Sequence, residues 1–205
     1  MNIEDYYRRN LPASEIHAQN ILKYGPQLPF GHPKGLPEQM ERIEFIVSHA
    51  NGLILDVGSD SGYILNQCGG DVGLDLFLSR IKAAKYWYPH LSFVQAPAED
   101  LPFREGTFDT VILAELLEHV GNPETVLAQA HIVLKPDGKL IVTVPDEIAG
   151  KSHMNPEHVR RFTEGSLRNL LNESFDIEEV EYVHGDFPSW CMCCRKFEAL
   201  AMRRI

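Results

Sequence analysis

The segment Glu115-Leu-Leu-Glu118-His119 places two carboxyl groups and an imidazole within five residues. In a helix, positions three and four apart lie on the same side, so the spacing predicts that these side chains share one face of a helix. Such groups bind divalent cations, and His158 is a candidate fourth ligand. The alternative is that Glu118 and His119 serve packing and hydrogen bonding. In that case His119 or His158 is the candidate catalytic base, because the pKa of histidine lies near neutrality.

A second group of residues has the spacing of a nucleotide-binding site. Residues 53–57 form a short apolar run that contains Asp56, and Gly58 and Gly62 follow it. Glycines permit a sharp turn and a close approach of a ligand to the backbone. Asp75 lies 19 residues after Asp56. An acid at about that distance from a glycine turn is placed to bind the two hydroxyls of a ribose.

A sheet is needed to position these residues, and the pattern from residue 53 onward predicts one. The alternation of strands and helices favours a parallel sheet covered on both faces, closed by a hairpin without an intervening helix. We therefore expect an α/β fold with a doubly wound, mostly parallel, seven-stranded Rossmann-like sheet, an antiparallel terminal hairpin and an N-terminal helical cap. The predicted strands are 53–57, 71–75, 91–95, 107–114, 139–144, 176–183 and 196–203, and the predicted helices are 13–24, 37–51, 62–68, 77–87, 116–120, 123–134 and 163–174.

The length of the chain sets its domain organisation. With 205 residues it is long enough for one well-packed domain and short for two. Residues 1–52 carry several prolines and glycines and predict a cap or lid segment. Residues 53–205 predict one compact unit.

Charge and hydropathy exclude some classes of partner. The net charge is −10, from 29 acidic and 19 basic residues, which disfavours a long nucleic-acid footprint. A small basic patch of Arg160, Arg161 and Arg168 stays open as a local exception. No apolar run reaches the length of a membrane span, so we expect a cytoplasmic protein. The sequence leaves the oligomeric state open.

Four cysteines are present, and three of them lie within four residues near the C-terminal end. A zinc site usually requires two separated pairs, which this spacing does not supply. We expect reduced thiols in a hairpin loop for Cys191, Cys193 and Cys194, with Cys68 separate from them.

Five segments resemble class I S-adenosylmethionine-dependent methyltransferases, in the order and spacing of that family. The Glu-x-x-Glu-His pattern is similar to metal-assisted O-methyltransferases, which include ubiquinone-biosynthesis and small-RNA 3′-end 2′-O-methyltransferases. The segments are Leu-Asp-Val-Gly-Ser-Asp-Ser-Gly (55–62), Gly-Leu-Asp-Leu-Phe (73–77), Ala-Glu-Asp-Leu-Pro-Phe (98–103), 108–120 and 133–140.

The resemblance implies S-adenosylmethionine as cofactor and a small-molecule acceptor that is methylated on oxygen. It implies that the turn holds the methionine end of the cofactor, that Asp75 holds the ribose, and that the adenine lies beside residues 98–99. The implied cofactor residues are Asp56, Gly58, Ser59, Gly62, Asp75, Leu76, Ala98, Glu99 and Glu115, and the implied ligands of a divalent metal such as magnesium are Glu115, Glu118, His119 and His158.

Two departures from the family pattern affect the cofactor site. Asp60 stands where the family has the middle glycine of the turn, and Pro97 stands where an acidic residue is frequent. Both departures favour weakened cofactor binding. Gln95 or Asp100 is a candidate to replace the acidic side chain that is missing at position 97. Two alternatives therefore remain: an RNA 3′-end methyltransferase, and a binding or regulatory protein that keeps the fold without turnover.

Overall fold

A mixed seven-stranded sheet forms the centre of the protein. The structure is a computed structural model, and it describes residues 3–24, 37–146, 148, 157–185 and 188–197. The strand order is β3-β2-β1-β4-β5-β7-β6, in which β7 is antiparallel to both of its neighbours. The expected α/β sheet, mostly parallel with an antiparallel edge hairpin, is confirmed. The strands are β1 (Ile54–Val57), β2 (Val72–Asp75), β3 (Ser92–Gln95), β4 (Phe108–Ala114), β5 (Leu134–Pro145), β6 (Phe175–Val183) and β7 (Ser189–Lys196).

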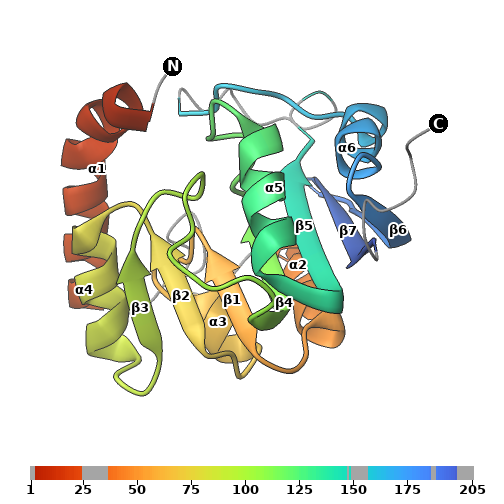
Figure 1. Cartoon of the computed structure of the whole chain (residues 1–205). Coiled ribbons are helices and arrows are strands. Elements are labelled where there is room, and N and C mark those ends of the chain that lie inside the picture. Colours follow the sequence, from red (N-terminus) through yellow and green to blue (C-terminus); the bar gives the residue numbers. More distant parts are fainter. Residues whose placement is uncertain (1–2, 25–36, 147, 149–156, 186–187, 198–205) are drawn as a thin grey trace.

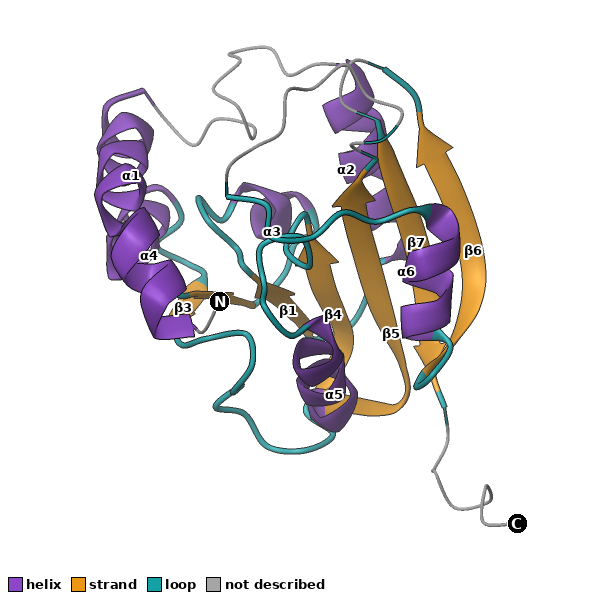
Figure 2. Ribbon diagram, turned by 90° about the horizontal axis from the view of Figure 1, so that it is seen from above, coloured by secondary structure: helices purple, strands orange, loops and turns teal. Residues whose placement is uncertain are grey.

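Helices cover both faces of the sheet (Figure 2). α2 and α3 lie over one face, where Phe45 and Leu65 are buried. α5 and α6 lie over the other, where Leu127 and Leu167 are buried. Because both faces are covered, the central strands carry continuous apolar runs, such as Val111–Ala114 in β4, rather than a strict alternation of apolar and polar residues. The helices are α1 (Ile3–Tyr24), α2 (Pro37–His49), α3 (Tyr63–Gln67), α4 (Leu78–Trp87), α5 (Pro123–Val133) and α6 (Glu164–Leu171).

Local sequence signals fix where the helices on the second face begin. Asn122 accepts a hydrogen bond from the Thr125 amide, and Pro123 occupies the first turn of α5. α6 begins with a capping box in which Thr163 and Ser166 exchange hydrogen bonds. Both caps satisfy amides that have no partner inside the helix.

The N-terminal helix α1 lies along α4 at the β3 edge of the sheet (Figure 1). It begins ten residues earlier than the sequence predicts, and Pro12 lies inside it. Its apolar contact is small, with Ala18 and Ile21 packed against Ala83. The Trp87 indole also donates a hydrogen bond to the Ile21 carbonyl, at 2.9 Å.

Two predicted elements are wrong. Residues 116–120 form a turn and not a helix, and Glu115 before them has a φ of 50°, outside the helical range. The second strand of the edge hairpin is Ser189–Lys196, whereas 196–203 was expected, and residues 198–205 lie outside the described part. Cys191, Cys193 and Cys194 therefore lie in a strand rather than in a loop.

In the described part of the chain, no helix has the length and apolar character required to span a membrane.

Candidate cofactor and acceptor site

The carboxyl ends of β1, β2, β3 and β4 meet at one edge of the sheet, because these strands are parallel neighbours. In open α/β sheets this edge is where ligands bind. The glycine turn follows β1, Asp75 ends β2, Gln95 ends β3 and Glu115 follows β4. The fold thus brings the predicted cofactor residues to one edge.

The turn from Gly58 to Gly62 needs both of its glycines. Their φ values are 79° and 74°, in the left-handed region that glycine adopts without strain. A Cβ atom on Gly58 would lie 3.0 Å from Leu116, and one on Gly62 would lie 2.8 Å from Phe93. The amides of Gly58 and Ser59 donate to the Leu74 carbonyl, so hydrogen bonds to β2 hold the turn.

Asp56 and Asp75 are both buried at this edge. Burial, together with the nearby charges of Asp75 and Asp60, raises the pKa of Asp56 to about 7. Burial also raises the pKa of Asp75 above its usual range. A buried pair of acids with raised pKa values has a desolvation cost that a bound cation or a diol donor offsets.

The Asp75 carboxylate organises the turn from the end of β2. One oxygen accepts the Phe77 amide at 2.8 Å, and the other accepts the Asp60 amide at 3.1 Å. Each carboxylate oxygen has a second acceptor position, which leaves capacity for hydroxyl donors. Leu76 follows Asp75, and its carbonyl accepts the side-chain amide of Gln95 at 3.1 Å.

The segment after β3 carries the residues expected beside the adenine. Ala98 is buried, and the Glu99 Oε2 atom is buried without a hydrogen-bond partner in the described structure. A buried acceptor without a partner has a desolvation cost, so it is a candidate ligand contact. Glu99 therefore offers an acceptor two residues after Pro97, which offers none from its side chain.

Glu115 is held by two neighbours that the sequence analysis did not connect to it. Its Oε1 atom accepts the Thr143 hydroxyl at 2.9 Å, and its Oε2 atom lies 3.2 Å from Nη1 of Arg42. The Arg42 side chain is only 3% exposed, and its Nε and Nη2 atoms have no hydrogen-bond partner in the described structure. Arg42 is the residue that sequence reasoning missed; its signal was an arginine between apolar positions of a predicted helix.

Glu118, His119 and His158 form a separate cluster, in which one ligand atom from each lies within 4.8 Å of the others. The two histidine rings meet edge to face with their centroids 4.6 Å apart. The His119 Nδ1 atom lies 3.3 Å from the Glu157 carbonyl, an acceptor, so Nδ1 carries the proton and Nε2 has the lone pair. Glu115 does not join this cluster, because the turn directs it toward Arg42.

Backbone hydrogen bonds hold the cluster together. The Glu118 carbonyl accepts the amides of Val159 and Arg160, at 2.9 and 3.3 Å. Burial, together with the charge of the neighbouring His158, lowers the pKa of His119 to about 4. The imidazole is therefore neutral near pH 7, the form that accepts a proton or binds a metal. Leu116 in the same turn faces Gly58, so the cluster adjoins the cofactor turn.

Comparisons with known proteins find methyltransferases among the sequences and structures similar to this chain. The family described as "Methyltransferase domain" matches residues 55–142. A ubiquinone biosynthesis O-methyltransferase of Acinetobacter baylyi is 31% identical over 111 residues, which cover 47% of this chain and 47% of that protein. The chain spans about half the length of the curated relatives it matches.

Solved structures share the fold at low sequence identity. The 1,6-didemethyltoxoflavin-N1-methyltransferase of Burkholderia thailandensis, with bound S-adenosylhomocysteine, has a TM-score of 0.72 and 20% identity, covering 95% of this chain and 89% of that one. The (4+2)-cyclase SpnF has a TM-score of 0.74 and 17% identity, covering 95% and 96%. At these identities the likeness shows the fold alone. The sequence likeness is to methyltransferases: besides the family match over residues 55–142, a protein of Mycolicibacterium smegmatis described as a probable S-adenosylmethionine-dependent methyltransferase is 24% identical over 136 residues, which cover 62% of this chain and 53% of that protein.

Proposed function

We propose that this protein transfers the methyl group of S-adenosylmethionine to an oxygen atom of a small molecule. The observation that carries the proposal is the position of two buried acids, Asp56 and Asp75, around the glycine turn and next to a histidine cluster. The acids suit the cationic and diol groups of the cofactor, and the cluster suits deprotonation of an acceptor.

The reaction is an in-line displacement. The acceptor oxygen attacks the methyl carbon, the carbon–sulfur bond breaks, and its electron pair stays on sulfur, which loses its positive charge. The proton of the acceptor hydroxyl passes to a base, for which His119 Nε2 is our candidate, with His158 beside it. Alignment of acceptor and methyl group supplies much of the rate enhancement.

We propose separate contacts for the methionine, ribose and adenine parts of the cofactor. Asp56 and the turn from Gly58 to Gly62, with Ser59, face the methionine end. Asp75 and Leu76 face the ribose, and the unpartnered oxygen of Glu99 accepts from the adenine beside Ala98. Arg42 is held by Glu115, and within the described residues its Nε and Nη2 atoms have no hydrogen-bond partner, which suits an anionic oxygen of cofactor or acceptor.

A divalent metal is a second candidate for the cluster of Glu118, His119 and His158. One carboxylate with two imidazoles suits zinc, manganese or iron better than magnesium, which prefers oxygen ligands. The metal would lower the pKa of an acceptor hydroxyl. Glu115 pairs with Arg42 and is not part of the proposed ligand set.

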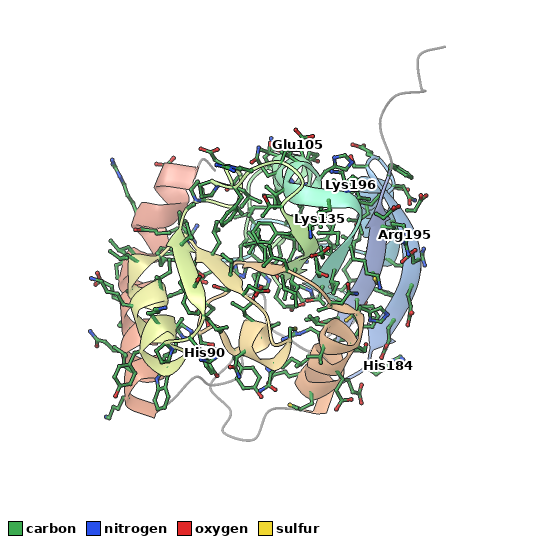
Figure 3. The ribbon with its side chains drawn as sticks, turned by 60° about the horizontal axis from the view of Figure 1, so that its bottom comes forward. His90, Glu105, Lys135, His184, Arg195 and Lys196 are labelled. Atoms are coloured by element: carbon green, nitrogen blue, oxygen red, sulfur yellow. The ribbon has the colours of Figure 1, made fainter. Side chains whose placement is uncertain are left out.

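Two alternatives have different support. Methylation of an RNA end is disfavoured because Lys135, Arg195 and Lys196 gather at the amino end of β5, opposite the site (Figure 3). Two of them are also paired with acids, Lys135 with Asp109 at 2.7 Å and Arg195 with Glu178 at 2.6 Å. A protein that keeps the fold without turnover is supported by Asp60 and Pro97, the two departures from the family pattern at the cofactor site.

The test is transfer of radiolabelled methyl from S-adenosylmethionine to a panel of phenols and catechols, with and without EDTA. We expect transfer to at least one acceptor by the parent protein and by Asp176→Asn, an exposed control, and at least a tenfold loss in His119→Ala. Loss of transfer in EDTA would favour the metal candidate. Cofactor binding without transfer to any acceptor would favour the non-enzymatic alternative.

A further inference from the structure

Asp60 holds an unusual conformation in the middle of the cofactor turn. Its φ is 46°, in the left-handed region that is strained for residues other than glycine. Such strain persists only where surrounding contacts determine the conformation. The contacts of Asp60 therefore decide the shape of the turn.

The Asp60 side chain contacts the N-terminal helix α1 and the helix α4. Its Oδ2 atom lies 3.0 Å from Nε2 of His17 in α1, and its Oδ1 atom lies 3.4 Å from Nη1 of Arg80 in α4. Arg80 in turn donates from Nε to the buried hydroxyl of Ser14 in α1, at 2.9 Å. One carboxylate thus joins the cofactor turn to two helices.

The backbone of Asp60 faces the cofactor site. Its amide donates to Oδ2 of Asp75, the acid proposed to bind the ribose. A change in the backbone conformation of Asp60 would move this amide and release one oxygen of Asp75. The contacts with α1 and the position of Asp75 are therefore linked through one residue.

We propose that Asp60 couples docking of α1 to binding of the cofactor. The contact with His17 holds the turn in its left-handed conformation and so positions Asp75 for the ribose. Because coupling between two sites is reciprocal, a bound cofactor in return holds α1 on α4. Asp60 is a positioning residue here, since it acts through Asp75. The inference rests on the cofactor site proposed above.

Electrostatics support the pairing. The hydrogen bond to Asp60 raises the pKa of His17 above 6.5 despite partial burial. The pKa of Asp60 is lowered: burial opposes this, but the hydrogen bond from His17 and the charge of Arg80 outweigh burial. The charged groups that face the pair are Arg80 from α4, Asp75 from β2 and Asp56 from β1.

The experiment is a double-mutant cycle read by calorimetric titration with S-adenosylhomocysteine. It uses the parent, His17→Ala, Asp60→Gly and the double variant, with Gln19→Ala as an exposed control on the same helix. We expect His17→Ala to weaken binding about fivefold or more, and Gln19→Ala to bind like the parent. Asp60→Gly should bind within about twofold of the parent, because glycine adopts the turn without support from α1.

The double-mutant cycle distinguishes a failure of the coupling between α1 and the cofactor from a failure of the cofactor site itself. In the Asp60→Gly background, His17→Ala should have no further effect. Hydrogen exchange should show that the ligand slows α1 amides in the parent but not in Asp60→Gly. Equal affinity of His17→Ala and parent, or the same loss in both backgrounds, would overturn the coupling alone. No binding by the parent would overturn the proposed cofactor site and the coupling with it.

Discussion

Arg42 on α2 and Glu115 after β4 form a nearly enclosed ion pair, with Nη1 of the arginine 3.2 Å from Oε2 of the glutamate. The arginine side chain is 3% exposed and the glutamate side chain 20%. A charge at this depth is costly unless it is paired. The pair therefore ties α2 to the end of β4, where the turn of residues 116–120 begins.

Removal of one member of this pair is expected to destabilise the protein. Arg42→Met leaves the Glu115 carboxylate without its cation, and we expect a loss of about 3 kcal/mol in the free energy of unfolding, measured in urea. The double variant Arg42→Met, Glu115→Gln should recover most of that loss, because no unpaired charge remains. Equal stability of the single and double variants would contradict this account of the pair.

Asp56 predicts a pH dependence of cofactor binding. Because its pKa is raised to about 7, the carboxyl is mostly neutral at pH 6 and mostly ionised at pH 8. If the ammonium group of S-adenosylhomocysteine binds the ionised form, affinity should be up to about tenfold weaker at pH 6 than at pH 8. Titrations at both values measure this, and Asp56→Asn should bind weakly at both.

The same raised pKa predicts an opposite trend in stability. The ordinary value is 3.8, so the folded state binds a proton more strongly than the unfolded chain does. The contribution of Asp56 to stability is present below pH 3.8 and is lost as pH rises through about 7. Asp56→Asn should therefore show a larger gain in unfolding free energy at pH 8 than at pH 5. An equal effect at both values would contradict the raised pKa.

The two glycines of the cofactor turn, Gly58 and Gly62, are not expected to tolerate a side chain. Gly58→Ala and Gly62→Ala each place a Cβ on a residue with φ above 70°, at 3.0 Å from Leu116 and 2.8 Å from Phe93 respectively. We expect each to lower the unfolding free energy by about 1–3 kcal/mol. Gly106→Ala is the matched control, because it shares a positive φ but has open space around it. Equal losses in all three would mean that backbone strain, and not crowding, dominates.

The cysteines of β7 are expected to be unreactive in the folded protein. Cys191, Cys193 and Cys194 are buried, and burial raises the pKa of each thiol, that of Cys193 to about 11. The thiolate is the reactive form, so alkylation by iodoacetamide at pH 8 should require unfolding. Modification of native protein at these residues within minutes would contradict their placement. Mass spectrometry of the modified peptides distinguishes them from Cys68.

The sheet could be predicted from sequence because its signals are local. Residues 53–57 are an apolar run that ends at glycine, and Thr163 with Ser166 caps a helix by short-range hydrogen bonds. The turn at 116–120 could not be predicted, because the same spacing fits a helix. Its geometry depends on Thr143, which accepts the Glu115 amide through its carbonyl from a neighbouring strand.

The other differences between the sequence-based predictions and the structure also depend on residues that are far apart in the sequence. The role of Asp60 depends on His17, 43 positions earlier in the chain, so its departure from the family glycine could be seen but not explained. The strand Ser189–Lys196 contains three cysteines, and its register is set by pairing with β5 and β6. The Arg42 contact joins two segments more than 70 positions apart.

Calorimetric titration of S-adenosylhomocysteine into the parent protein, Asp75→Asn and Asp176→Asn tests the central claim most directly. Asp75 accepts two amides at the edge where the cofactor is proposed to bind, whereas Asp176 is exposed on the edge strand β6. We predict micromolar binding by the parent and by Asp176→Asn, and at least a tenfold loss in Asp75→Asn. Equal affinity of all three proteins, or no binding by the parent, would contradict the proposed site.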